Sequence, residues 1–135
     1  MPAMPNAPPV TPQPSTGAQQ PRVLVVDDEP TVRMVARLML ERTGYVVEEA
    51  GDAAAAVARV RAAVRSFAVV LLDVTLPDRA GTELLPDLRN HAPGARVVLT
   101  SGKPEEEFPD HGADGYLPKP FTKEQLLAAV RAVTV

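Results

Sequence analysis

Four short apolar runs in this sequence each end in a polar group of a kind that can hold a phosphate or a metal ion. The runs and the groups that follow them are 22–26 before Asp27 and Asp28, 68–72 before Asp73, 96–100 before Ser101 and Gly102, and 115–118 before Lys119. Magnesium prefers oxygen ligands such as carboxylates, and ammonium and hydroxyl groups donate hydrogen bonds to phosphate oxygens. Brought together, these side chains would make a site for a divalent cation and a phosphoryl group.

The apolar runs themselves predict how the polar groups meet. Short runs rich in valine and leucine, separated by helical patterns, are typical of parallel strands buried on both faces. In such sheets the ligand site lies outside the carboxyl ends of the strands. Five strands alternate with helices here, so right-handed crossovers predict a doubly wound α/β sheet with helices on both faces.

Residues that favour helix ends give approximate bounds for the helices. Pro30 suits a first helical turn, and Gly44 is predicted to end that helix. Asp52 and Thr122 are predicted to cap two later helices. The other expected elements are a strand over 45–49, an alanine-rich helix running to about residue 65, and a helix from about 82 to 90.

Length and composition exclude several classes of protein. The 135 residues fit one domain with a real core, and an apolar fraction of 45% is ordinary for a globular protein. The net charge of −3 argues against nucleic-acid binding, and the absence of cysteine excludes disulfides and thiolate metal sites. Without a long apolar run or a signal peptide, a cytoplasmic protein that spans no membrane is expected.

The segment 1–21 differs in composition from the rest of the chain. It carries no charged side chain and contains many prolines, which disfavour both helices and central strands. Such a segment has little apolar mass to offset the entropy of ordering it. A disordered proline-rich tail over 1–21 is therefore predicted, followed by a folded domain over 22–135.

Taken together and in order, the strand-end motifs resemble the receiver domain of bacterial two-component response regulators. They are Val-Asp-Asp-Glu-Pro at 26–30, Leu-Leu-Asp at 71–73 with Leu76, Pro77 and Gly81, Thr-Ser-Gly at 100–102, and Gly-Tyr-Leu-Pro-Lys-Pro-Phe at 115–121. The resemblance covers about 22–135 and is to stand-alone receivers of the chemotaxis-regulator kind. It implies a flavodoxin-like parallel sheet with the strand order 2-1-3-4-5.

The same resemblance implies a role for each polar group. Asp73 looks like the phosphoacceptor, whose carboxylate attacks the phosphorus of a phosphohistidine. Magnesium, for which manganese could substitute, is expected on Asp27, Asp28, Asp73 and the backbone carbonyl of Thr75. The phosphoryl-binding and switch residues implied are Ser101, Gly102, Lys119 and Tyr116, and the Lys119–Pro120 bond is expected to be cis.

One region departs from the family pattern. The stretch from Ser101 to Lys119 is shorter than in most receivers, and Pro104 and Pro109 flank its only helical segment. Because proline disrupts a continuing helix, the fourth helix is predicted to be short, distorted or absent. The output face, or the coupling of Tyr116, is then expected to differ from the usual one. His111 lacks metal-ligand spacing and is expected at the surface.

The leading functional prediction is a single-domain response regulator, which is not an enzyme beyond its own phosphorylation and dephosphorylation. Its expected partners are a sensor histidine kinase or histidine phosphotransfer protein and a downstream protein target, with the chain a monomer or weak dimer. Two alternatives are a receiver fragment of a hybrid kinase or larger regulator, and a module that binds without phosphorylation. A hydrolase of the haloacid dehalogenase type would need an aspartate where Thr75 stands.

Overall fold

The computed structural model of this chain describes residues 20–134 and contains one parallel sheet of five strands. The strand order is β2-β1-β3-β4-β5, so the predicted order 2-1-3-4-5 is confirmed. The strands are β1 (Arg22–Val26), β2 (Val46–Ala50), β3 (Val69–Asp73), β4 (Arg96–Ser101) and β5 (Gly115–Pro118). The helices are α1 (Pro30–Glu41), α2 (Ala53–Ala62), α3 (Gly81–His91), α4 (Lys123–Thr134) and the short 3₁₀ helix η1 (Glu105–Glu107). The predicted tail lies almost wholly outside the described residues.

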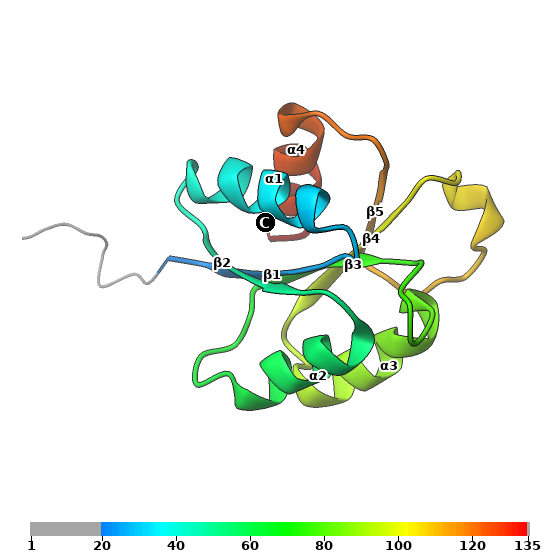
Figure 1. Cartoon of the computed structure of the whole chain (residues 1–135), viewed down its shortest axis with the longest axis horizontal. Coiled ribbons are helices and arrows are strands. Elements are labelled where there is room, and N and C mark those ends of the chain that lie inside the picture. The colour runs from blue at the N-terminus through cyan, green and yellow to red at the C-terminus, as the bar shows by residue number, and fades with distance from the viewer. Residues whose placement is uncertain (1–19, 135) are drawn as a thin grey trace, which may run out of the picture.

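Helices cover both faces of the sheet, with α1 and α4 on one face and α2 and α3 on the other (Figure 1). Successive side chains of a strand point to opposite faces, which is why β1 contributes to two cores. Val23 and Val25 pack in the cluster that includes α1 and α4, while Leu24 and Val26 pack in the cluster that includes α2 and α3. Every residue of β3 is buried, as expected for a strand covered on both faces.

The helix bounds differ slightly from the sequence prediction. Helix α1 ends at Glu41, with Arg42 as its cap residue, and Gly44 lies in the following turn with a φ of 100°. Helix α2 ends at Ala62, earlier than predicted, because the backbone of Ala63 is already extended. The Asp52 cap is confirmed, since its side chain accepts a hydrogen bond from the Ala55 N–H.

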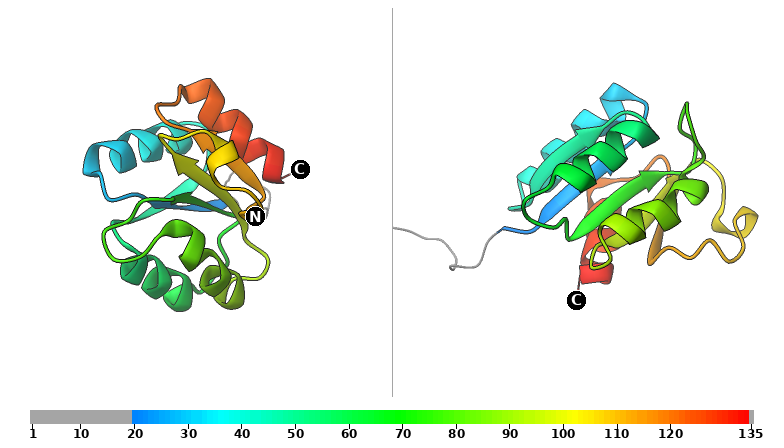
Figure 2. Two further views of the ribbon diagram at one scale, coloured as in Figure 1. Left: turned by 90° about the vertical axis from the view of Figure 1, so that its right-hand side faces the viewer. Right: turned by 90° about the horizontal axis from the view of Figure 1, so that it is seen from below.

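The connection between β4 and β5 contains only η1, so the prediction of a short or absent fourth helix is confirmed. Figure 2 shows this segment standing apart from the two helical layers. This segment has no regular helix, and side-chain contacts pack it against the rest of the domain. The Tyr116 ring lies 6.1 Å from Phe108 and 6.0 Å from His111, measured between ring centroids.

The prediction that His111 is a surface residue was wrong. Its side chain is 12% exposed and its Nε2 lies 2.9 Å from Glu105 Oε2. Its Nδ1 accepts a hydrogen bond from the Ala113 N–H, so both ring nitrogens serve the local structure. Spacing along the sequence could not show this, because the contacts depend on how the shortened connection folds back. Among residues 20–134, no helix is long and apolar enough to cross a membrane.

Candidate functional site

Three carboxylates meet at the carboxyl edge of the sheet. Asp27 and Asp28 follow β1, and Asp73 is the last residue of β3, the neighbouring strand. One oxygen from each lies within 4.8 Å of the others. Asp27 and Asp73 are 2% and 3% exposed, whereas Asp28 is open to solvent. Two anions at the end of a buried sheet are costly unless a cation balances them.

Lys119 supplies part of that balance. Its ammonium Nζ lies 3.0 Å from Asp27 Oδ2 and 3.2 Å from Asp73 Oδ2, and the exposed Glu29 lies 3.8 Å away. The Lys119 N–H donates to the Ser101 carbonyl at 2.7 Å, which continues the pairing of β4 with β5 and fixes the lysine backbone. The Lys119–Pro120 peptide bond is cis, as expected.

The electrostatics of the edge show that the carboxylates are only partly compensated. Burial raises the pKa of Asp73, and the negative charge of Asp27 raises it further, against the opposing effects of the Thr75 N–H and of Lys119. Burial also acts to lower the pKa of Lys119, but the hydrogen bond to Asp27 and the charge of Asp73 outweigh it, so that pKa is raised. Within the cluster of three carboxylates, the single ammonium of Lys119 therefore contacts only those of Asp27 and Asp73.

This donor set fits a hard divalent cation. Carboxylate oxygens converge from two adjacent strand ends, and a net negative charge remains after Lys119 is counted. Magnesium and manganese both take such oxygen ligands. Thr75 lies directly beside these groups, since its N–H donates to Asp73 Oδ1 at 3.0 Å.

The loop after β3 is held tightly against the phosphoacceptor candidate. The Gly81 N–H donates to the Val74 carbonyl at 2.7 Å, and Thr75 forms an isolated antiparallel bridge with Ala80. A Cβ added at Gly81 would lie 2.2 Å from the Asp73 carbonyl oxygen. The start of α3 therefore approaches the end of β3 so closely that only glycine fits.

The structure also reveals Asp78, which sequence reasoning missed. Its two carboxylate oxygens accept hydrogen bonds from the N–H groups of Ala53 and Ala54, at 2.8 and 3.0 Å. These two hydrogen bonds lower the pKa of Asp78. With Asp52 on Ala55, three free N–H groups at the start of α2 have carboxylate acceptors. A cap supplied from beyond the next strand leaves no local sequence signal, so only the fold could show it.

Arg33 is a second residue that the sequence did not single out. Its Nη1 donates to the Asp27 carbonyl at 2.6 Å, and its Nε donates to Glu49 at 3.1 Å. The side chain thus ties the loop that carries the acidic pair to the edge strand β2. The only sequence feature that could have pointed to Arg33 was its place one turn after Pro30 on α1.

The predicted switch residues lie on one hydrogen-bonded path. The Ser101 hydroxyl, which is buried, accepts a hydrogen bond from the Lys103 N–H at 3.0 Å. The Tyr116 hydroxyl donates to the carbonyl of the same Lys103. Gly102 lies between them, and a Cβ there would meet no atom within 4 Å. Ser101 and Tyr116 therefore both hydrogen-bond to Lys103, so a movement of Ser101 that breaks its bond to the Lys103 N–H changes the backbone that Tyr116 contacts.

A parallel α/β sheet with a lysine and three carboxylates at its carboxyl edge matches the arrangement that the sequence predicted for a receiver domain. The chain belongs to the family of response regulator receiver domains, whose family model matches residues 23–131. It is 37% identical over 115 residues to the probable transcriptional regulatory protein TcrX of Mycobacterium tuberculosis, across 82% of this chain and 48% of that protein.

Solved structures support the same assignment. The chemotaxis response regulator CheY4 of Vibrio cholerae matches with a TM-score of 0.79 and 30% identity, across 85% of this chain and 99% of that one. The response regulator TrrA of Thermotoga maritima, solved in complex with Mg²⁺-BeF, matches with a TM-score of 0.76 and 26% identity, across 84% and 99%. The chain spans about half the length of the curated relatives it matches, at 48% and 49% for the first two.

Proposed function

We propose that this chain accepts a phosphoryl group on Asp73 from a phosphohistidine of a sensor kinase or histidine phosphotransfer protein. The observation that carries this proposal is the joint contact of Lys119 with Asp27 and Asp73 beside a third carboxylate. In this interpretation residues 22–135 form the receiver unit, preceded by the proline-rich tail. The chain acts as a cytoplasmic signalling protein and turns over no external substrate.

The transfer itself is a nucleophilic displacement at phosphorus. An oxygen of the ionised Asp73 carboxylate forms the new O–P bond, and the P–N bond to the donor imidazole breaks with its electron pair leaving on nitrogen. The departing imidazole takes a proton from solvent. Lys119, which already lies 3.2 Å from Asp73 Oδ2, donates to the incoming phosphoryl oxygens and offsets their charge.

Asp27, Asp28, Asp73 and the Thr75 carbonyl are the residues proposed to hold Mg²⁺ or Mn²⁺. When bound, the cation neutralises the carboxylates and polarises the phosphoryl group. The Thr75 N–H holds Asp73 Oδ1 at 3.0 Å, so Oδ2 is the oxygen proposed to attack, once the Lys119 ammonium, now 3.2 Å from it, turns to the incoming phosphoryl group. Support comes from the convergence of the three carboxylates and from the Mg²⁺-BeF complex of the related TrrA.

The docking surface for the phosphodonor is proposed to be α1 and the start of the segment after β5. Met34, Val35 and Leu38 of α1 are 47%, 37% and 42% exposed. A hollow of about 350 Å³ lies beside the site, lined by Glu29, Thr31, Val32, Val35, Lys119, Pro120 and Phe121. Exposed apolar side chains that flank a polar site favour a protein partner that must reach Asp73.

The output is proposed to pass from Ser101 through Lys103 to Tyr116. A phosphoryl group on Asp73 adds acceptor oxygens for the Ser101 hydroxyl, which then leaves the Lys103 N–H. Because Tyr116 holds the Lys103 carbonyl, the segment carrying η1 is released or repositioned. A downstream protein that binds this segment would distinguish the two states. The half-length coverage of relatives supports a second candidate, in which the same unit serves as the receiver of a larger regulator.

Intact mass spectrometry after incubation with acetyl phosphate and Mg²⁺ tests the proposal. A gain of one phosphoryl group is expected, and it should be lost with a chelator and in Asp73→Asn. Asp110→Asn is the matched control, since Asp110 is exposed and lies outside the acidic cluster. If wild type gains no mass while a known receiver reacts, the phosphoacceptor proposal is wrong, and a module that binds without phosphorylation would replace it.

A further inference from the structure

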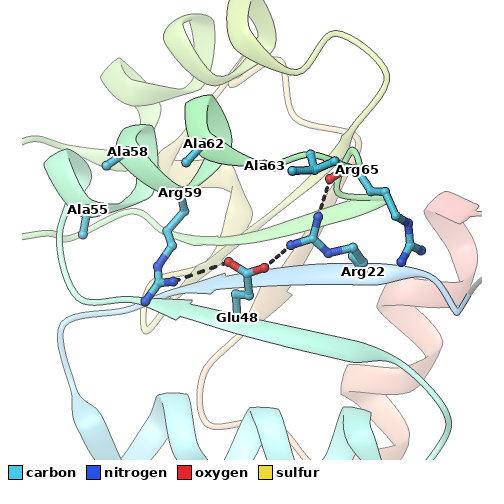
Figure 3. Close-up of a pocket in the computed structure, with 9 residues that line it drawn as sticks. Arg22, Glu48, Ala55, Ala58, Arg59, Ala62, Ala63 and Arg65 are labelled. Carbon is cyan, nitrogen blue, oxygen red and sulfur yellow. Dashed lines mark hydrogen bonds and ion pairs between the residues drawn. The ribbon is translucent and has the colours of Figure 1, made fainter.

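A groove of about 630 Å³ lies between α2 and the β2 edge of the sheet (Figure 3). Its apolar lining comes from α2 and the residues after it, namely Ala55, Ala58, Ala62, Ala63 and Val64. Val64 is fully exposed, at 100%. The polar part of the lining is Arg22, Arg59, Arg65 and Glu48, so none of the residues assigned to phosphorylation belongs to the groove.

The groove has more hydrogen-bond donors than acceptors. Figure 3 shows Arg22 and Arg59 converging on Glu48, which contacts both guanidinium groups. Arg65 adds a third guanidinium, and its own carbonyl accepts from Arg22. A guanidinium carries five N–H donors and no acceptor, so a single carboxylate satisfies only a few of them. An occupant rich in carbonyl acceptors, with small apolar side chains, would fit such a groove.

The segment 1–19 of this chain has that chemistry. It contains six prolines, each without an N–H donor, together with alanine, valine and methionine side chains. No side chain in it is charged, so none of its side chains repels the arginines or competes with Glu48. Because proline lacks an N–H, the segment offers more backbone carbonyl acceptors than N–H donors.

The structure places Gln20, the first described residue after this segment, in contact with Arg65, which lines the groove. The Arg65 guanidinium donates to the carbonyl of Gln20 at 3.0 Å, and Gln20 is the residue at which the segment 1–19 joins the domain. This segment can extend about 60 Å, whereas α2, with 10 residues, is about 15 Å long. A tethered segment has an effective concentration in the millimolar range, so even a weak contact is populated.

We propose that residues 1–19 of this chain bind in the α2–β2 groove, with backbone carbonyls accepting hydrogen bonds from Arg59 and Arg65. The contact already made at Gln20 is the first of this series. The assignment is independent of the phosphorylation chemistry, because it uses no residue of that site.

Paramagnetic relaxation in the full chain tests this assignment. The sequence has no cysteine, so Ala7→Cys provides a unique attachment point for a nitroxide. Peak intensities of backbone amides in α2 and β2 are expected to fall relative to the diamagnetic control, while those in α4 stay unchanged. Adding Ala58→Glu, which places a competing carboxylate in the groove, should restore the intensities. Ala54→Glu, on the same helix and also exposed but outside the lining, should not.

Three results would overturn the proposal. Broadening spread evenly over the surface, or none at all, would mean that the segment has no preferred site. If the broadening persists in Ala58→Glu as fully as in Ala54→Glu, the segment contacts a surface other than the groove. In a mixture of isotope-labelled chains without nitroxide and unlabelled chains with it, the labelled chains could also show broadening. If that broadening is lost on dilution, the groove binds the segment of another copy instead.

Discussion

Replacing Gly81 by alanine is expected to destabilise the fold and to displace Asp73, the proposed phosphoacceptor, in one step. A Cβ at this position would lie 2.2 Å from the Asp73 carbonyl oxygen and 3.0 Å from the Val74 Cα. Both are backbone atoms at the end of a fully buried strand, so they cannot move aside as a flexible side chain would. The short hydrogen bond from the Gly81 N–H to the Val74 carbonyl would be strained by the same movement.

The size of the effect follows from the overlap. The contact must open from 2.2 Å to at least 3.0 Å, a displacement of about 0.8 Å between the start of α3 and the end of β3. Overpacking in a well-packed core costs about 1–3 kcal/mol, and a clash between two backbones belongs at the upper end. A loss of about 3 kcal/mol in the free energy of unfolding would lower Tm by about 10 °C in a domain of this size.

Chemical denaturation with thermal unfolding measures this loss, and Gly94→Ala is the matched control. Gly94 does not have a positive φ, and a Cβ there would meet no atom within 4 Å. Its replacement should leave stability within about 0.5 kcal/mol or raise it slightly. The rate of phosphorylation by acetyl phosphate should fall in Gly81→Ala and not in Gly94→Ala. Equal stability of the two variants would refute the steric argument.

Four further predictions concern the site and the path to η1. Asp73→Asn should be more stable than wild type at pH 7, because the raised pKa of Asp73 means that the native state disfavours the charged carboxylate. This difference in unfolding free energy should shrink as the pH falls toward 3.8, the pKa of the group in the unfolded chain. Equal unfolding free energies of the two proteins at pH 7 would contradict the prediction. Asp78→Ala should destabilise the domain at neutral pH and less so in acid. The lowered pKa of Asp78 contributes stability that is present above pH 3.8 and is lost as the pH falls through the pKa of the folded state. Chemical denaturation across this pH range should show the difference in unfolding free energy between variant and wild type disappearing. Mg²⁺ at 100 times its Kd should stabilise wild type by about 2.7 kcal/mol and Asp27→Asn by much less at the same concentration, which thermal unfolding with and without chelator would check. Tyr116→Phe removes the hydroxyl that donates to the Lys103 carbonyl and should cost about 1 kcal/mol of stability. Amide hydrogen exchange around η1 should become faster in this variant, and unchanged exchange would argue against a Tyr116 anchor.

Much of the architecture could be predicted because it depends on local pattern. Valine-rich runs such as 69–72 form strands that are buried on both faces, and the helical spacing between them forces parallel crossovers. The polar residue after each run is then placed at the carboxyl edge by topology alone. The missing fourth helix was predictable for the same kind of reason, because Pro104 and Pro109 act on their own local backbone.

The contacts between distant segments could not be predicted in this way. Asp78 caps α2 from a loop that follows the next strand, and Arg33 ties the Asp27 carbonyl to Glu49 on another strand. The His111 side chain turned out to be only 12% exposed because the shortened connection folds against Tyr116. Each of these depends on the path of a loop, which many side chains determine together.

Beyond the strand order, which the family resemblance implied, the sequence by itself determined the alternation of strands and helices, the members of the acidic edge and the loss of the fourth helix. Each of these follows from the periodicity of a short run or from the stereochemistry of single residues such as proline. Only the tertiary structure decided how the charges balance, with Lys119 between Asp27 and Asp73. Distances of a few ångströms and the exclusion of water determine such energies, and both exist only after the separate strand ends have packed side by side.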